Sequence, residues 1–229
     1  MQAQRCFCGA DDSGFAKTDY MSLTEYQRKR HFVVTPEPSG GKKPARKRGR
    51  GLIYVIQKHR ASQLHYDFRL EWARVLISWA VPKGPSLDPS VKRLATRVED
   101  HPIDYAEFEG VIPEGEYGAG TVMLWDQGTW VPEEEDVGAA LEKGELKFTL
   151  RGRKLKGSWV LVRTRGFGKN PTRSSWLLIK HRDRYASTKD VTENQPYSVA
   201  SHRLLAEIAS DAGGDVAKAA TGDPKKLSS

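Results

Sequence analysis

Cysteine is almost absent from this 229-residue chain, which contains two, Cys6 and Cys8, both near its start. Two cysteines cannot build a disulfide framework, so the sequence predicts a protein of the reducing cytoplasm rather than a secreted one. They also lack the second cysteine pair that a structural zinc site of the common four-ligand kind requires.

Long apolar runs are missing as well. No stretch approaches the roughly 18 apolar residues of a membrane span, and residues 1–10 lack the apolar segment of a secretory signal. A hydrophobic fraction of 38% with six tryptophans still suffices for a packed core, which excludes a wholly disordered chain. We therefore expect a globular cytoplasmic protein.

Negative charge falls short of positive charge, because 37 Lys and Arg face 29 Asp and Glu, a net charge of +8. Most of the excess lies in residues 1–51, above all between Lys42 and Arg50, within a stretch rich in Pro and Gly. Such a stretch cannot bury apolar surface and is typical of a flexible linker. It is either a solvated tether or an arm that holds nucleic-acid phosphates without reading sequence.

Crossover helices are also scarce, and the middle of the chain is predicted to form short strands. Turns rich in Gly, Pro and Asp, such as 81–85 and 125–128, separate β-branched and aromatic runs. The predicted strands are Leu52–Lys58, Leu64–Trp72, Val75–Val81, Arg93–Glu99, Thr121–Trp125, Leu146–Leu150, Ser158–Thr164 and Trp176–His181. This order favours an antiparallel barrel or sandwich.

Helices are predicted at few places: Ser22–Phe32, Glu133–Lys143 and His202–Ser210. The first is expected to be capped by Ser22 or Thr24. From Gly213 onward the composition predicts disorder. The predicted division is an arm with a basic linker (1–51), a β domain (52–187) and a linker-like, partly disordered tail (188–229).

The segment Leu64–Glu71 alternates strictly between apolar and polar residues. Successive side chains of a strand point to opposite faces, so one face is apolar and the other carries His65, Asp67 and Arg69. An ordinary strand with a solvated outer face shows the same alternation. The residue types favour a metal site over an ordinary solvated face, because His65 and Asp67 lie about 7 Å apart along a strand and can converge on one ion.

His59 precedes this strand, and a turn could fold it back toward His65. Two histidines and one aspartate within nine residues form a three-ligand set for a divalent transition metal, with positions left for substrate or water. Arg69 on the same face offers a guanidinium fork that suits a phosphate.

Two further side chains are candidates, each with a functional and an ordinary structural interpretation. His101 precedes a proline and therefore ends a strand, where it serves as general acid, phosphate donor or ordinary turn residue. Lys83 is either an exposed turn lysine or a phosphate contact. The Gly-rich run 110–120 lacks the Gly-Lys-Ser/Thr ending of a P-loop, so we interpret it as a tight loop between strands.

Ordered motifs along the chain, from about residue 23 to residue 206, resemble one family. It is the 3′-phosphoesterase module of bacterial ligase D, a DNA end-joining repair protein, with its stand-alone relatives. The motifs are Gln57–His59, Leu64–Glu71, Ser78–Ser86, Val98–Pro102, Phe108–Gly110, Ile112–Gly115, Tyr117–Gly120 and Leu178–His181. The resemblance implies a mainly β fold, a compact antiparallel barrel of about eight strands with a polar groove and one or two short helices.

The resemblance also implies an activity. Such a module is a manganese-dependent hydrolase, with other divalent transition metals as alternatives, that removes a 3′-terminal ribonucleoside and then the 3′-phosphate to leave a ligatable 3′-OH. Its substrates would be DNA or DNA/RNA 3′ ends at primer–template junctions. A DNA ligase and a Ku-type end-binding protein are the implied partners of a monomer associated with the nucleoid.

Carried over residue by residue, the family pattern makes His59, His65 and Asp67 the metal ligands. It places Arg69 and His101 at the scissile phosphate, with His101 as transition-state stabiliser or proton donor. The remaining residues implied for this pocket are Tyr105, Gln57, Ser78, Lys83 and Arg93.

The N-terminal arm departs from the family at one position. The family's Lys-Arg-Asp-Phe and Thr-Pro-Glu-Pro patterns read here as Lys29–Phe32 and Thr35–Pro38. Arg30 and Glu37 match, whereas His31 replaces the aspartate. The resemblance implies that the arm assists ribonucleoside removal, so this is the half of the activity that the departure affects.

Two other interpretations stay open at this point. A non-catalytic barrel that binds nucleic-acid ends needs cations and stacking aromatics, and has no use for a His/His/Asp set. A metal barrel that binds sugars or acids is disfavoured by Arg69 and the basic arm. The sequence has no Lys-x-Asp-Gly nucleotidyltransferase motif, so we expect a free-standing end-healing module or a fragment of a larger ligase.

Overall fold

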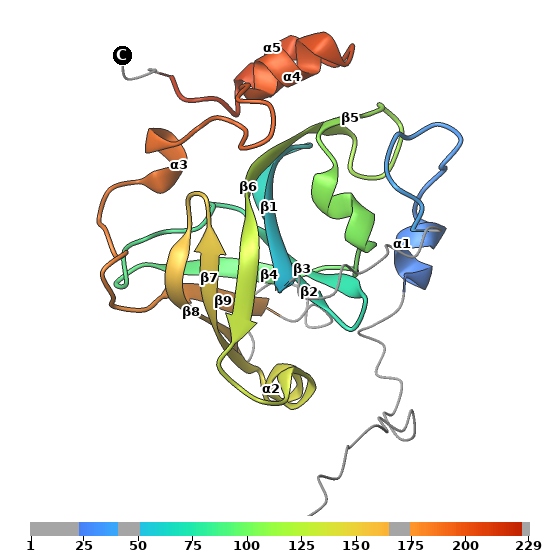
Figure 1. Cartoon of the computed structure of the whole chain (residues 1–229). Helices are drawn as coiled ribbons and strands as arrows, with labels where there is room; N and C mark the ends of the chain where they lie inside the picture. Colours follow the sequence, from blue (N-terminus) through green and yellow to red (C-terminus); the bar gives the residue numbers. More distant parts are fainter. Residues whose placement is uncertain (1–22, 41–50, 165–174, 226–229) are drawn as a thin grey trace, which may run out of the picture.

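Nine antiparallel strands form one sheet that closes on itself in the computed structural model, which describes residues 23–40, 51–164 and 175–225 (Figure 1). The strands are β1 (Leu52–Arg60), β2 (Leu64–Trp72), β3 (Val75–Val81), β4 (Lys92–Arg97), β5 (Gly110–Ile112), β6 (Gly120–Pro132), β7 (Glu145–Gly152), β8 (Lys156–Thr164) and β9 (Ser175–Lys180). The order is β1-β2-β3-β4-β9-β8-β7-β6-β5, and β1 also pairs with β6. Eight strands thus close the predicted barrel, and β5 extends it beside β6.

All eight predicted strands are present, but the turn predicted at 125–128 is wrong. These residues lie inside β6, which continues past a register shift at Ile56 and Gln57 of β1. Gly128 is there because β7 comes close: an added Cβ would lie 2.3 Å from the Arg151 carbonyl oxygen. Asp126 accepts hydrogen bonds from the Tyr54 hydroxyl and two backbone amides instead of making a turn.

The inward side chains of the strands form the main hydrophobic core. Alternate residues of β2 contribute Tyr66, Phe68 and Leu70, which are all buried. Tryptophans of β3, β6 and β8 pack with them, and Phe68 stacks on Phe148 with ring centroids 5.7 Å apart. The apolar half of the alternating segment is therefore the inner wall of the barrel.

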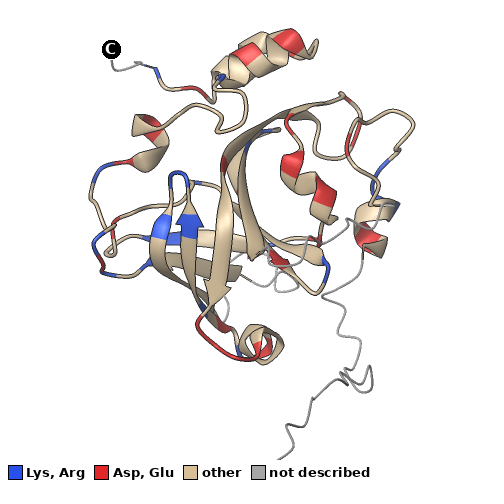
Figure 2. Ribbon diagram, in the orientation of Figure 1, with Lys and Arg blue, Asp and Glu red and all other residues tan. Residues whose placement is uncertain are grey.

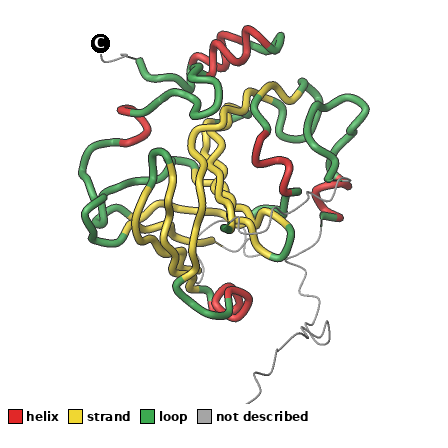
Figure 3. The backbone as a smooth tube through the Cα atoms, in the orientation of Figure 1, coloured by secondary structure: helices red, strands yellow, loops and turns green. Residues whose placement is uncertain are grey.

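The outer surface of β1, β3 and β6 is covered as well. A second cluster packs Val55, Leu76 and Leu124 against Tyr26 of α1 (Thr24–Arg28) and Tyr105 of the 3-10 helix η2 (Ile103–Glu107). Figure 3 shows these helices and the long loops beside the barrel wall. Because of this cover, the polar face of β2 is not an ordinary solvated one.

The helices within the described residues are short but more numerous than the one or two expected. Besides α1 and η2 they are α2 (Val137–Lys143), α3 (Val191–Asn194), α4 (Leu205–Asp211) and α5 (Val216–Ala220). The first helix is N-capped by Leu23 rather than by Thr24, with no side-chain hydrogen bond at the cap, and Ser22 lies outside the described residues. α2 begins only at Val137 because the Asp136 carboxylate caps it, accepting from the Ala139 amide at 3.0 Å.

The tail differs most from the expectation. Disorder from Gly213 is wrong for residues 213–225, since α5 forms there and Ala219 is buried, while residues 226–229 lie outside the described part of the chain. Leu205 and Ile208 of α4 join the barrel core, and Asp223 accepts from the backbone amide of Leu205 at 3.0 Å. The domain boundaries at residues 51 and 187 stay predictions.

Charge is distributed unevenly over the described residues (Figure 2). Acidic residues lie on η2 and α1, whereas basic residues gather at the hairpin between β7 and β8. The basic linker between Lys42 and Arg50, with Cys6 and Cys8, lies outside the described residues. Among the described helices, none is long and apolar enough to cross a membrane.

Candidate metal centre

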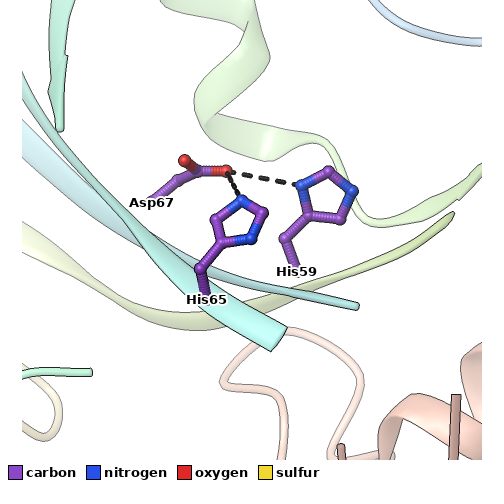
Figure 4. A group of neighbouring side chains, drawn as sticks. All are labelled: His59, His65 and Asp67. Carbon is purple, nitrogen blue, oxygen red and sulfur yellow. Dashed lines mark ion pairs between the residues drawn. The ribbon is translucent and has the colours of Figure 1, made fainter. Parts of the chain in front are cut away.

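The β1–β2 hairpin brings the three predicted metal ligands together (Figure 4). His59 and His65 are direct cross-strand partners, and Asp67 lies opposite Gln57, two residues along. Their ligand atoms all lie within 4.8 Å of one another. Asp67 Oδ2 is 3.6 Å from both His59 Nδ1 and His65 Nε2. The antiparallel register thus places His59 beside His65, which the sequence alone had left as a possibility.

The outer nitrogen of each imidazole is held by a backbone carbonyl. His59 Nε2 donates to the Gly118 oxygen at 2.8 Å, and His65 Nδ1 donates to the Gln63 oxygen at 3.1 Å. A carbonyl only accepts, so these nitrogens carry protons, and in the neutral form of each ring the nitrogen facing Asp67 has the lone pair that a metal needs. Such outer bonds orient histidine ligands in metal sites.

Asp67 is an ionised carboxylate at neutral pH in this environment. Burial acts to raise its pKa, but Arg69 and His65 outweigh burial and hold that pKa well below its usual range. For His65 burial acts to lower the pKa, and Asp67 outweighs it, so the pKa is raised. The group therefore offers one anionic oxygen and two oriented nitrogens to a cation.

Arg69 connects the metal ligands to the rest of the site. Its Nε donates to Gln57 Oε1 at 2.8 Å, Nη1 donates to Ser78 Oγ at 2.9 Å, and Nη2 lies 3.1 Å from Asp67 Oδ2. Nη1 also lies 2.9 Å from His101 Nδ1. The residue is 2% exposed, so the orientation of its side chain is fixed by these partners. Gln57 and Ser78 thus both contact Arg69, and the supporting roles implied for them stay predictions.

His101 is a neutral imidazole between two arginines. Burial, then Arg69 and Arg30, lower its pKa well below the usual value. Nε2 lies 3.3 Å from Arg30 Nη2, and Nδ1 lies 2.9 Å from the Glu99 carbonyl oxygen as well as from Arg69. A neutral ring has one N–H, so Nδ1 satisfies either the carbonyl or the arginine, not both.

The N-terminal arm lies against this pocket. Arg30 forms a buried ion pair with Glu37 at 2.8 Å, and Glu37 accepts from the Tyr105 hydroxyl at 3.0 Å. His31 contacts no member of this pocket among the described residues. Its side chain is largely exposed and its Nδ1 lies 3.2 Å from a Glu116 oxygen. The structure thus joins Arg30, Glu37 and Tyr105, and separates His31 from them.

Two residues of the predicted set lie elsewhere. Lys83 is exposed on the turn after β3, and Arg93 lies on β4 with its Nε buried and without a hydrogen bond. Neither makes a described contact with Arg69 or His101. The roles implied for them, like those of the whole set, stay predictions.

Two contributors were not among the predicted site residues. Glu99 lies 3.4 Å from both Arg30 and Lys29 and anchors the arm. Its position directly before Asp100 and His101 in a quoted motif was the available signal. Gly118 provides the carbonyl that orients His59, and here the glycine-rich run was the signal.

Known proteins similar to this chain were found at both the family and the sequence level. Residues 57–163 match the DNA Ligase D 3′-phosphoesterase domain family. A multifunctional non-homologous end joining protein LigD of Pseudomonas aeruginosa is 57% identical over 187 residues, 80% of this chain and 22% of that protein.

Two mycobacterial relatives are also similar. A LigD DNA repair protein of Mycobacterium tuberculosis is 48% identical over 144 residues, 63% of this chain and 18% of its own. The LigD protein of Mycolicibacterium smegmatis is 41% identical over 166 residues, 70% of this chain and 21% of its own. The chain spans about a fifth of the length of these relatives.

Proposed function

We propose that this chain, whose residues 57–163 belong to the DNA ligase D 3′-phosphoesterase domain family, is a metal-dependent hydrolase that heals DNA 3′ ends for end-joining repair. One observation carries the proposal: an oriented His59, His65 and Asp67 set lies directly beside the Arg69 guanidinium. A cation site joined to a fixed guanidinium suits a phosphate ester, whose charge both groups offset.

The residues present fit a divalent transition metal. Two imidazole nitrogens and one ionised carboxylate are ligands that manganese, iron and zinc accept. The outer hydrogen bonds to Gly118 and Gln63 support the same assignment. When bound, the metal would supply Lewis acidity toward a phosphate oxygen and a lowered pKa of bound water. Manganese is the metal we propose.

Arg69 is the proposed phosphate-binding side chain. A guanidinium has five N–H donors, and the contacts with Gln57, Ser78, His101 and Asp67 use about four of them. The remaining donor is on Nη2, the nitrogen beside the metal-ligand Asp67. A phosphate oxygen near the metal is therefore within reach of a cation that needs no reorientation.

His101 is proposed to stabilise the transition state by hydrogen bonding. Its lowered pKa disfavours a resting imidazolium, so it has one N–H and one lone pair at neutral pH. Arg30 beside Nε2 supplies positive charge to the same pocket. The Arg30–Glu37 pair and the Tyr105 hydroxyl hold this arginine in place.

A primer–template with a 3′-phosphate tests the proposal. With manganese the protein should release inorganic phosphate, EDTA should stop the release, and His65→Ala or Asp67→Ala should lower the rate by more than about 100-fold. Lys143→Ala, at an exposed lysine of α2 with no role in the proposed site, is the matched control. An unaltered protein that binds the end but releases no phosphate with any divalent metal would instead be a non-catalytic end-binding barrel.

A ribonucleotide-ended primer tests the finer activity in parallel. The proposed substrates include DNA and DNA/RNA ends, and a ligase and a Ku-type protein are the proposed partners. His31→Asp restores the family's carboxylate, so it should raise nucleoside release relative to phosphate release. Equal ratios for both proteins would mean that this position does not govern the nucleoside step.

A further inference from the structure

Tyr117 is an exposed aromatic side chain at the rim of the candidate site. It lies in the loop between β5 and β6 and is 48% exposed, whereas Tyr26 and Tyr105 of the same region are 0% and 2% exposed. The next residue, Gly118, provides the carbonyl that accepts from His59. The phenol ring is thus one residue away from the group that orients a metal ligand.

Cations of the N-terminal arm lie beside this ring. Lys29 Nζ is 4.7 Å from the ring centroid and 3.4 Å from its hydroxyl, and Arg30 Cζ is 5.7 Å from the centroid. Arg30 also reaches His101 in the phosphate pocket. The ring therefore lies beside Arg30, which itself contacts His101 of the proposed phosphate pocket, and nearly half of the tyrosine is open to solvent.

The loop that carries Tyr117 has a defined conformation. Gly115 and Gly118 have φ values of 91° and 81°, a region that favours glycine. His31 of the arm lies 3.2 Å from Glu116 of the loop, so arm and loop are joined next to the tyrosine (Figure 1). Tyr117 belongs to neither hydrophobic cluster of the described residues, so core packing does not account for it.

We propose that Tyr117 stacks on the base of the 3′-terminal nucleotide and thereby places its phosphate at Arg69 and His101. The inference rests on the proposed function. It adds a contact with the terminal base, the part of the substrate that the phosphate pocket does not touch. Every base has a π-face, so stacking on a tyrosine binds ends of any sequence. Tyr117 is then a substrate-binding residue that acts through position rather than chemistry.

Steady-state phosphate release from a 3′-phosphate primer–template tests this. Tyr117→Ala should raise KM by about tenfold with kcat little changed, because an alanine cannot stack. Tyr117→Phe and Tyr117→Trp should keep KM near that of the unaltered protein. Tyr185→Ala, at an exposed tyrosine next to Arg184, is the control.

A substrate with an abasic 3′-terminal nucleotide provides a second test. The KM of the unaltered protein should rise by about the same factor on this substrate. Tyr117→Ala should not raise KM further on the abasic end. A 2-aminopurine base at the 3′ end should be quenched on binding by the unaltered protein and not by Tyr117→Ala, a readout independent of turnover.

The two proposals fail in different ways. An unaltered protein that releases no phosphate overturns the proposed function and this inference with it. An active protein whose KM is unchanged by Tyr117→Ala, or whose alanine variant still distinguishes abasic from normal ends, overturns the stacking role alone.

Discussion

The two faces of the β1–β2 hairpin are built from alternate residues of the same strands, yet one face packs apolar side chains and the other carries bonded charges. Inward, Phe68 packs among aromatic rings of the barrel core. Outward, Asp67 and Arg69 are as well buried, at 6% and 2% exposed, but they are charged and bonded to named partners. Burying a charge costs free energy that apolar residues avoid. We therefore expect the residues of the outer face to contribute mainly to function and those of the inner face mainly to stability.

The largest effect expected from this comparison is on stability. Phe68→Ala should lower the free energy of unfolding by about 3–5 kcal/mol, because it leaves a cavity among packed rings. Urea denaturation measures it, and Phe68→Leu is the milder variant if the alanine protein does not fold. The folded fraction should retain its metal affinity and phosphate release. A selective loss of activity at full stability would contradict the division between the faces.

A smaller effect on stability with a clear effect on rate is expected on the outer face. Gln57→Leu removes the acceptor of Arg69 Nε and the donor to the Tyr105 and Phe108 carbonyls. Unpaired buried groups cost about 1–3 kcal/mol, and kcat for phosphate release should fall about tenfold. Gln57→Glu keeps an acceptor for Arg69, so it should recover kcat better than leucine. Equal kcat values would mean that Gln57 does not position Arg69.

The smallest expected effect is a pH dependence of stability that differs between the two faces of the sheet. Asp126 lies on the core side beside Tyr54, where burial raises its pKa, although bonds from Tyr54 and backbone amides oppose this. The folded protein therefore binds the proton more tightly than the unfolded one between the usual pKa of 3.8 and the raised value. Its contribution to stability is present at low pH and is lost as pH rises through this window.

Denaturation at several pH values checks this. The free energy of unfolding of the unaltered protein, minus that of Asp126→Asn, should decrease as the pH rises from 3.8 through the raised pKa. Asp67 should show the opposite trend, because its pKa is lowered: its contribution is present above the usual pKa and lost toward acid. A constant difference for Asp126→Asn would contradict the assigned shift.

Much of the fold could be predicted because strand periodicity is local. The alternation from Leu64 to Glu71 assigned both faces of β2 correctly, and all eight barrel strands followed from short runs. β5 was missed, since three residues within a glycine-rich run show no periodicity. The Asp-Gln-Gly motif at 126–128 predicted a turn because the close approach of β7 to Gly128 is not visible in the sequence.

By itself the sequence determined the barrel strands and the closeness of the candidate ligands His59, His65 and Asp67, because these residues lie within one hairpin. Only the tertiary structure decided that the outer face is buried, that Arg30 and Glu37 lie on the pocket, and that the tail packs on the barrel. Arg30 meets His101 across 71 positions of sequence. Contacts of that separation depend on how the elements dock, and no local periodicity encodes them.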